Sequence, residues 1–375
     1  MATIATMFSG GEGVGVGARA AGMEHVWGIE READIAEVAR ANGFGVMVGD
    51  VREVDAGRLE RPDVLHASPP CPSFSPANGK RGETAEDVSL AEAVVRFLDS
   101  LRPRVFTLEN VIPYRLSLSW RLIRSKLFEL GYMVTVDRVN AADFGVPQTR
   151  RRMVVRAVSG GLLQPLPHRE EWRGWYEAIE DLLEGLPDSD FAPWQRERLA
   201  ESLPTSLVAQ GGFRGSVVTR GGREPAFSIT ANSNQAGLKA FLVGGQFSTT
   251  AEDGGKRLSI RGEHEPAFTA MASYSGDWRA FVVNGGNSGR DLLTVRRADE
   301  PIFTVSAGSH HVPRAALAMG RVVQMTPRAL ARFQAFPDSY VLPEGKRLAC
   351  KVIGNAVPPR LYEGIVRQLV GMWER

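Results

Sequence analysis

The sequence contains little cysteine and no long apolar segment. Only Cys71 and Cys350 occur among 375 residues, which argues against a disulfide framework and against a cysteine-rich metal site. No run of eighteen apolar residues occurs, so no membrane span is indicated. The first residues, MATIATMFSGGEG, lack the basic and apolar regions of a signal peptide. We therefore expect a cytoplasmic protein without a metal site.

Lysine is also scarce, and the net charge is close to zero. Six lysines occur among 45 basic residues, the rest are arginine, and the formal charge is +2. Arginine suits contacts to phosphate and to guanine. A GC-rich genome would produce the same bias. Composition alone therefore leaves nucleic-acid binding open.

Short apolar strands alternate with helices over the first 110 residues. Strands are expected at residues 2–8, 25–29, 46–48, 64–67 and 105–108, and helices at about 14–21, 34–41 and 90–101. This alternation predicts an α/β fold with a doubly wound, mostly parallel sheet. Ligands bind beyond the carboxyl ends of the strands in such sheets. Phe8, Glu30, Asp50, Cys71 and Glu109 all fall near predicted strand ends.

A diverged repeat follows the α/β part. It reads RGGREPAFSITA from Arg220, RGEHEPAFTAMA from Arg261 and RRADEPIFTVSA from Arg296. Strand and turn signals at this spacing predict stacked β-hairpins. Helical character returns after about residue 328, and a last helix is expected near 360–373. We predict three segments: an α/β domain at 1–158, a β-rich module at 159–325 and a return to the first domain at 326–375.

A glycine-rich turn, FSGGEGVGVGA, follows the first strand. Gly13, Gly15 and Ala18 fit the dinucleotide fingerprint, and Glu30 stands at a distance suited to a ribose hydroxyl. The fingerprint is weak alone, so a nicotinamide oxidoreductase is an alternative. No Gly-Lys-Ser/Thr follows, which excludes a phosphate-binding P-loop.

Cys71 lies within SPPCPSFS, between prolines that cannot extend a sheet or a helix interior. They would hold the thiol in a turn at a strand end, where a nearby cation or helix N-terminus makes the thiolate accessible. A packing cysteine is the alternative. That alternative weakens because Glu109, in the sequence ENV, is expected at the end of the next strand.

Six ordered motifs together resemble those of the bacterial and phage DNA cytosine-C5 methyltransferases over nearly the whole chain. They are FSGGEG, PPCPSFS, ENV, QTRRR at 148–152, TPRALARFQAFPDSY from 326 and GNAVPP from 354. A variable module separates the arginine motif from the last two. The resemblance implies a Rossmann-like methyltransferase domain, dependent on S-adenosylmethionine, with an inserted β-rich target recognition domain.

The resemblance also implies roles for individual residues. The catalytic residues would be Cys71, Glu109, Arg150 and Arg152. S-adenosyl-L-methionine would be bound by Phe8, Ser9, Gly10, Gly13, Glu30, Asp50, Val51, Pro70, Asn355 and Ala356. DNA would be contacted by Ser75, Gln148, Arg220, Arg261 and Arg296. The implied reaction is methylation of C5 of a cytosine flipped out of duplex DNA, through a covalent adduct between Cys71 and C6.

Three residues depart from the family pattern. Glu12 stands where the family usually has glycine, Thr6 where many members have an acid, and Arg31 where an aromatic residue often follows the ribose glutamate. An RNA cytosine-5 methyltransferase and a catalytically silent DNA-binding homologue are further alternatives. As partners we expect double-stranded DNA and, where one exists, a cognate restriction endonuclease; the chain is expected to be a monomer.

Overall fold

The computed structural model describes residues 1–70, 82–161, 163–166, 170–187 and 325–370, and short strands between 207 and 324. The chain divides into two compact units. The first comprises Met1–Val146, Arg150–Glu171 and Gln334–Arg375. The second comprises Pro147–Thr149 and Trp172–Phe333.

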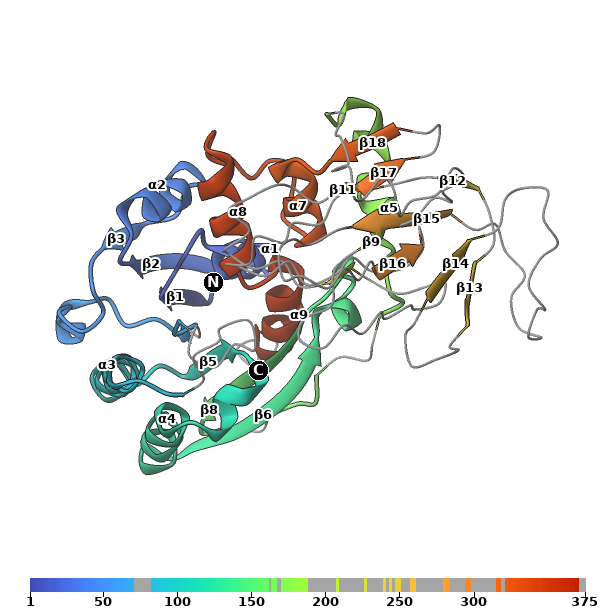
Figure 1. Cartoon of the computed structure of the whole chain (residues 1–375). Coiled ribbons are helices and arrows are strands. Elements are labelled where there is room, and N and C mark those ends of the chain that lie inside the picture. Colours follow the sequence, from blue (N-terminus) through green and yellow to red (C-terminus); the bar gives the residue numbers. More distant parts are fainter. Residues whose placement is uncertain are drawn as a thin grey trace. The chain divides into compact units, whose positions relative to one another are not determined.

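The first unit is built on a seven-stranded sheet with the order β3-β2-β1-β4-β5-β8-β6 (Figure 1). Its strands are β1 (Thr3–Met7), β2 (Glu24–Glu30), β3 (Val46–Val48), β4 (Val64–Ala67), β5 (Val105–Asn110), β6 (Tyr132–Asn140) and β8 (Arg151–Ser159). Neighbours from β3 to β5 are parallel, whereas β8 runs antiparallel to both β5 and β6. The predicted doubly wound, mostly parallel sheet is confirmed.

Helices flank this sheet. They are α1 (Gly13–Ala20), α2 (Ala33–Ala41), α3 (Ala85–Leu101), α4 (Leu118–Glu129), α8 (Lys346–Asn355) and α9 (Pro359–Val370). The first unit also has short 3₁₀ segments at η1 (Ala56–Arg58), η3 (Ile112–Leu116) and η4 (Ala141–Phe144), whereas η5 (Glu180–Gly185) belongs to the second unit. Helix α3 begins about five residues before its predicted start, because Thr84 and Asp87 form a reciprocal capping box there.

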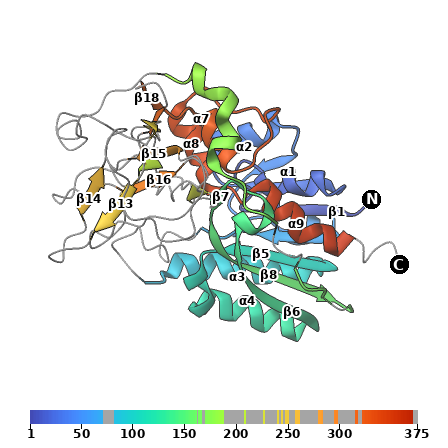
Figure 2. The ribbon, with the colours of Figure 1, turned by 90° about the vertical axis from the view of Figure 1, so that its right-hand side faces the viewer.

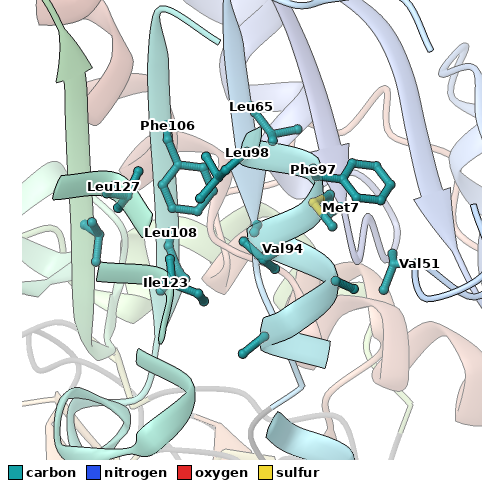
Figure 3. Packing of buried hydrophobic residues seen from close by; sticks show 14 of the residues in the cluster. Met7, Val51, Leu65, Val94, Phe97, Leu98, Phe106, Leu108, Ile123 and Leu127 are labelled. Carbon is teal, nitrogen blue, oxygen red and sulfur yellow. The ribbon is translucent and has the colours of Figure 1, made fainter. Parts of the chain in front are cut away.

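The two faces of the sheet bury different helices, because successive strand residues point to opposite sides. On one face, Phe106 and Leu108 of β5 pack against α3 and α4 (Figure 3). On the other face, Ile4 of β1 and Val105 of β5 pack against α1 and α9. Each such side chain contributes about 1.5–3 kcal/mol when fully buried.

Helices α1 and α9 lie side by side although they are far apart in the sequence (Figure 2). Glycine permits this approach. A Cβ on Gly17 would overlap the backbone of Pro359, and one on Gly13 would overlap the carbonyl of Val357. The glycines of the first turn thus make room for the C-terminal segment of the chain.

The second unit is β-rich, as predicted. Its seven-stranded sheet has the order β12-β15-β16-β9-β11-β18-β17, and its paired strands are antiparallel. The strands are β9 (Leu207–Val208), β11 (Lys239–Ala240), β12 (Val243–Gly244), β15 (Arg279–Val283), β16 (Thr294–Arg297), β17 (Ala315–Leu317) and β18 (Arg321–Gln324). Strands β13 (Phe247–Thr250) and β14 (Arg257–Ile260) form a separate antiparallel pair, and β10 (Ala226–Phe227) pairs with β7 (Gln148–Thr149). Helices α5 (Trp175–Ile179) and α7 (Pro327–Phe333) complete the described part of this unit.

Three strand pairs in this unit join neighbours in the sequence: β13 with β14, β15 with β16, and β17 with β18. The first pair precedes the second copy of the repeat, and β16 of the second pair includes the first two residues of the third copy, Arg296 and Arg297. Strand β9, however, lies between β16 and β11. Local strand and turn signals do not predict this long-range insertion.

No helix in the described part of the chain has both the length and the apolar character needed to cross a membrane. Within the same residues, no group of three or more His, Cys, Asp or Glu side chains could hold a metal ion.

Candidate active site

Polar and aromatic side chains gather at the carboxyl edge of the parallel strands in the first unit. Phe8 follows β1, Glu30 ends β2, Asp50 follows β3 and Glu109 lies near the end of β5. Backbone hydrogen bonds tie adjacent strand ends together: the amide of Ser9 donates to Ile29 over 3.0 Å, and that of Gly49 donates to Glu30 over 2.9 Å. These residues therefore share one edge of the sheet. Cys71 and Ser75 lie outside the described residues.

Glu109 is buried and faces two arginines. Its Oε1 lies 3.0 Å from Nε of Arg152 and 3.8 Å from Nε of Arg150. The pairing of β5 with β8 sets Glu109 opposite Val154, so Arg152, two residues away, lies on the same face. The contact with Arg152 has ion-pair distance but not hydrogen-bond alignment, because Oε1 makes no hydrogen bond. This oxygen is thus held in place yet keeps acceptor capacity.

Arg150 connects the arginine motif to the GNAVPP motif. Its Nη1 donates to the carbonyl of Gly354 over 3.1 Å, and its backbone amide donates to Oδ1 of Asn140 over 3.0 Å. Both ends of the residue are therefore fixed, and the side chain is almost fully buried. This places Gly354, and Asn355 after it, beside the Glu109 cluster.

The chain leading to Cys71 is held by two side-chain contacts. Nδ2 of Asn110 donates to the carbonyl of Pro69 over 3.1 Å, while its Oδ1 accepts from the amide of Val111. One residue earlier, the Oγ of Ser68 lies 2.6 Å from Nε2 of His66. Ser68 and Pro69, which lead to Cys71, are thus attached to strands β4 and β5.

The chain on the far side of residues 71–81 is anchored by Glu83. Its carboxylate accepts from the amides of Leu118 and Ser119, over 2.7 Å each, at the start of α4. Burial acts to raise the pKa of Glu83, but the bonds from Ser119 and Leu118 outweigh it and lower that pKa below its usual value. Glu83 thus fixes the chain directly before α3, which begins at Ala85.

His66 belongs to a buried polar chain that the sequence reading missed. Its Nδ1 lies 2.9 Å from Oγ1 of Thr107, which in turn lies 2.9 Å from the hydroxyl of Tyr362 in α9. Burial lowers the pKa of His66 to about 3 and raises that of Tyr362. The sequence signal that could have indicated this chain was a histidine and a threonine within two apolar strands that pair with each other.

The cofactor side begins with a constrained turn. Phe8 and Gly10 have positive φ, at 59° and 54°. The carboxylate of Glu30 accepts from the amides of Gly10 and Glu32, over 2.9 Å each. A carboxylate oxygen that accepts one amide keeps a further lone pair. Glu30 can therefore also accept hydrogen bonds from the hydroxyl groups of a ligand.

Asp50 is paired with Arg52 in this structure. Its carboxylate accepts from the Arg52 amide and Nε over 2.9 Å each, and from Nη2 over 2.5 Å. The hydrogen bond from the Arg52 side chain is the main reason that the pKa of Asp50 falls to about 2. With about four lone-pair sites on a carboxylate, one remains for an amine. Arg31, one of the departures from the family pattern, makes an exposed ion pair with Glu86 over 3.4 Å.

Other residues of the predicted cofactor site differ in exposure. Val51 is buried in the core beneath Phe8, Ser9 and Ala356 are buried, and Pro70 and Asn355 are exposed. A Cβ on Gly13 would lie 3.1 Å from Cβ of Ala356. Glycine at 13 thus serves packing against the C-terminal segment, not the approach of a phosphate that the dinucleotide fingerprint requires.

The predicted DNA contacts are distributed differently. Gln148 is fully buried and donates to the carbonyl of Phe333 over 3.1 Å. The side chain thus contacts the protein interior in this structure, and its predicted contact with DNA stays a prediction. Arg220 and Arg261 lie outside the described residues. Arg296 lies in β16, opposite Phe281 of β15 and Leu207 of β9.

Comparison with known proteins gives one consistent family. The model of the C-5 cytosine-specific DNA methylases matches residues 2–371. The type II methyltransferase M1.HphI of Haemophilus parahaemolyticus is 27% identical, covering 99% of this chain and 87% of that protein. M.Eco47II of Escherichia coli is 25% identical, covering 100% and 80%.

The fold agrees with that assignment. The solved structure of the Entamoeba histolytica methyltransferase EhMeth matches with a TM-score of 0.60 and 13% identity, covering 100% of this chain and 99% of that one. A nicotinamide oxidoreductase explains neither the glycine packing nor the match across nearly the whole chain. The chain therefore belongs to the C-5 cytosine-specific DNA methylase family and is a DNA (cytosine-5)-methyltransferase.

Proposed function

We propose that this protein transfers a methyl group from S-adenosylmethionine to C5 of a flipped-out cytosine in a specific duplex DNA sequence, through a covalent adduct of Cys71 with C6. The observation that carries the proposal is the buried Glu109 at the carboxyl edge of β5, 3.0 Å from Arg152. On the same strand, Asn110 holds Pro69, two residues before Cys71. The acid and the nucleophile motif thus share one support.

The chemistry follows from the poor nucleophilicity of cytosine C5. Addition of the Cys71 thiolate to C6 forms a carbon–sulfur bond and moves the electron pair of the C5–C6 bond toward C5. Negative charge spreads to N3, where the carboxyl group of Glu109 hydrogen-bonds or protonates the ring. Arg152 and Arg150 orient that carboxyl group, and Arg152 also holds the base oxygen. C5 uses that electron pair to form its bond to the methyl group, so that it then carries both the methyl group and its original proton. Removal of the C5 proton by a base supplies the electron pair that expels the Cys71 thiolate and restores the aromatic ring, and a proton placed on N3 returns to Glu109.

S-adenosylmethionine supplies an electrophilic methyl group on its sulfonium when bound. In this chain Phe8 stacks on the adenine, Glu30 accepts the ribose hydroxyls and Asp50 accepts the adenine amine. Ser9, Gly10, Pro70, Asn355 and Ala356 are the further candidates to line the site, and the buried Gly13 and Val51 would support it through packing. The support for this assignment is that Glu30 and Asp50 both retain acceptor capacity beside the turn at Phe8.

We propose that the β-rich module at 159–325 is the target recognition domain, inserted between the catalytic segments at 1–158 and 326–375. A base inside a duplex is out of reach of a buried carboxylate, so it must leave the stack. Ser75, Arg220, Arg261 and Arg296 are candidates for contacts with DNA. Arginine side chains that contact phosphate would position the protein on the DNA, and those that contact guanine would recognise the base sequence.

The test is covalent trapping on duplex DNA that contains 5-fluorocytosine, because fluorine cannot leave as a proton does. We expect an adduct in the unaltered protein and in Cys350→Ala, which leaves Cys71 as the sole thiol. Cys71→Ala should give no adduct and no incorporation of labelled methyl groups. Adduct formation by Cys71→Ala would contradict the mechanism. Preference for tRNA over duplex DNA in competition would instead favour an RNA methyltransferase.

A further inference from the structure

The buried carboxylate of Glu12 has no part in the chemistry proposed above. Glu12 is completely buried, and its φ of 60° is in the left-handed region, which favours glycine. A charged side chain in this conformation bears both backbone strain and desolvation. Such a combination persists only where the side chain makes compensating interactions.

Those interactions join four parts of the first unit. Oε1 of Glu12 accepts from Oγ1 of Thr6 in β1 over 2.5 Å and lies 3.0 Å from Nε2 of His25 in β2. Oε2 accepts from the amide of Gly15 over 3.2 Å, which caps α1. Thr6 Oγ1 in turn lies 2.8 Å from the hydroxyl of Ser9. The carboxylate thus ties the turn at 8–12 to two strands and to a helix start.

The surroundings leave space for this carboxylate and for little else. A Cβ on Gly28 would lie 2.5 Å from Glu12 Oε1 and 2.5 Å from Ser9 Oγ. A Cβ on Gly15 would lie 2.6 Å from Glu12 Oε2. On the other side of the turn, the hydroxyl of Tyr340 donates to the carbonyl of Gly11 over 2.5 Å. Gly15 and Gly28 therefore act as the walls of a site for one carboxylate.

Position 6 reaches the same space from β1. Thr6 is buried and its Oγ1 touches Glu12 Oε1, so a carboxylate on residue 6 would occupy the place that the Glu12 carboxylate fills. Two carboxylates there would repel each other. If neither residue carried a carboxylate, His25 and the Gly15 amide would lose their acceptor. One acid, from either position, satisfies the site.

We propose that Glu12 is a positioning residue that fixes the S-adenosylmethionine-binding turn. Its carboxylate lies in the turn itself and accepts the hydrogen bonds that an acid at position 6, in β1, would otherwise accept. The inference rests on the proposed function of the turn at 8–13. According to this proposal, the two departures from the family pattern, Thr6 and Glu12, depend on each other. Neither should be replaceable alone without loss of cofactor affinity.

The experiment is an exchange cycle of Glu12→Gly, Thr6→Asp and the double variant. Binding of S-adenosylhomocysteine is measured by calorimetry well below each variant's unfolding temperature, which is recorded separately. We expect each single change to weaken binding at least tenfold and the double variant to recover most of the loss. Glu37→Gln, an exposed change on α2, is the matched control and should bind as the unaltered protein does.

Three results would overturn the inference. The first is unchanged affinity in Glu12→Gly. The second is additive losses in the double variant. The third is recovery of the unfolding temperature alone, which would make Glu12 merely structural. Failure of the unaltered protein to bind S-adenosylhomocysteine would instead refute the proposed function of the turn. In that case the coupling is tested by hydrogen exchange of the backbone amides of residues 8–13. The double variant should recover the protection that each single variant loses, and a double variant without this recovery would refute the coupling.

Discussion

The carboxylate of Glu109 in β5 lies 3.0 Å from the guanidinium of Arg152 in β8, across an antiparallel pair of strands. A second guanidinium, that of Arg150, lies 3.8 Å from the same oxygen and is held by Gly354. One carboxylate therefore faces two positive charges in a buried setting. This arrangement is a rigid support for the acid role that we propose for Glu109.

Glu109→Gln keeps the shape of the side chain but removes the acid. We expect the rate of methyl transfer to fall by about 10²- to 10⁴-fold, the range for a lost general acid. Binding of S-adenosylhomocysteine should change little, because the cofactor residues lie on other strands. Single-turnover rates with saturating DNA measure the effect. Arg151→Gln is the control, since Arg151 is exposed on the same strand as Arg152, and an equal loss there would contradict a specific role for Glu109.

Asn110→Ala removes the hydrogen bond to Pro69. A buried acceptor without its donor costs about 1–3 kcal/mol. We therefore expect the Cys71 segment to be misplaced and adduct formation with 5-fluorocytosine DNA to slow, while cofactor affinity stays near that of the unaltered protein. If adduct formation keeps its rate, the bond does not position the nucleophile segment.

His66 should make stability depend on pH. Burial lowers its pKa to about 3 in the folded state, so the unfolded chain takes up the proton first as pH falls below about 6.5. The folded state therefore loses stability between pH 6.5 and 3, by at most about 1.4 kcal/mol per pH unit from this group. His66→Gln should show a shallower slope in urea unfolding between pH 7.5 and 5. An unchanged slope would show that other groups cause the dependence.

Gly17→Ala should destabilise the packing of α1 on α9. The new Cβ meets the backbone of Pro359, which cannot rotate away as a side chain could. We expect a loss of about 1–3 kcal/mol, typical of overpacking. Gly45→Ala is the matched control, because its Cβ would meet its nearest neighbour, the Val26 carbonyl, at an ordinary 3.9 Å. Thermal unfolding of both variants decides whether the close approach matters.

The alternation of strands and helices, the nature of the sheet and the family were all predictable from the chain. Periodicity and turn residues are local, and six ordered motifs identify a family without knowledge of contacts. The start of α3 was misplaced because the capping box at Thr84 precedes the apolar stripe on which the prediction relied. The burial of Gln148 could not be read from its motif, because burial depends on how distant parts of the chain pack.

The sequence by itself determined the family and the candidates for its chemistry, since Glu109, Arg150 and Arg152 stand in recognisable motifs. Only the tertiary structure decided which side chains meet. Arg150 and Gly354 are 204 positions apart and touch. Thr6, Glu12 and His25 share one buried site although nothing in their spacing requires it. The physical reason is that such contacts depend on how strands pair and helices pack, which many distant residues fix together.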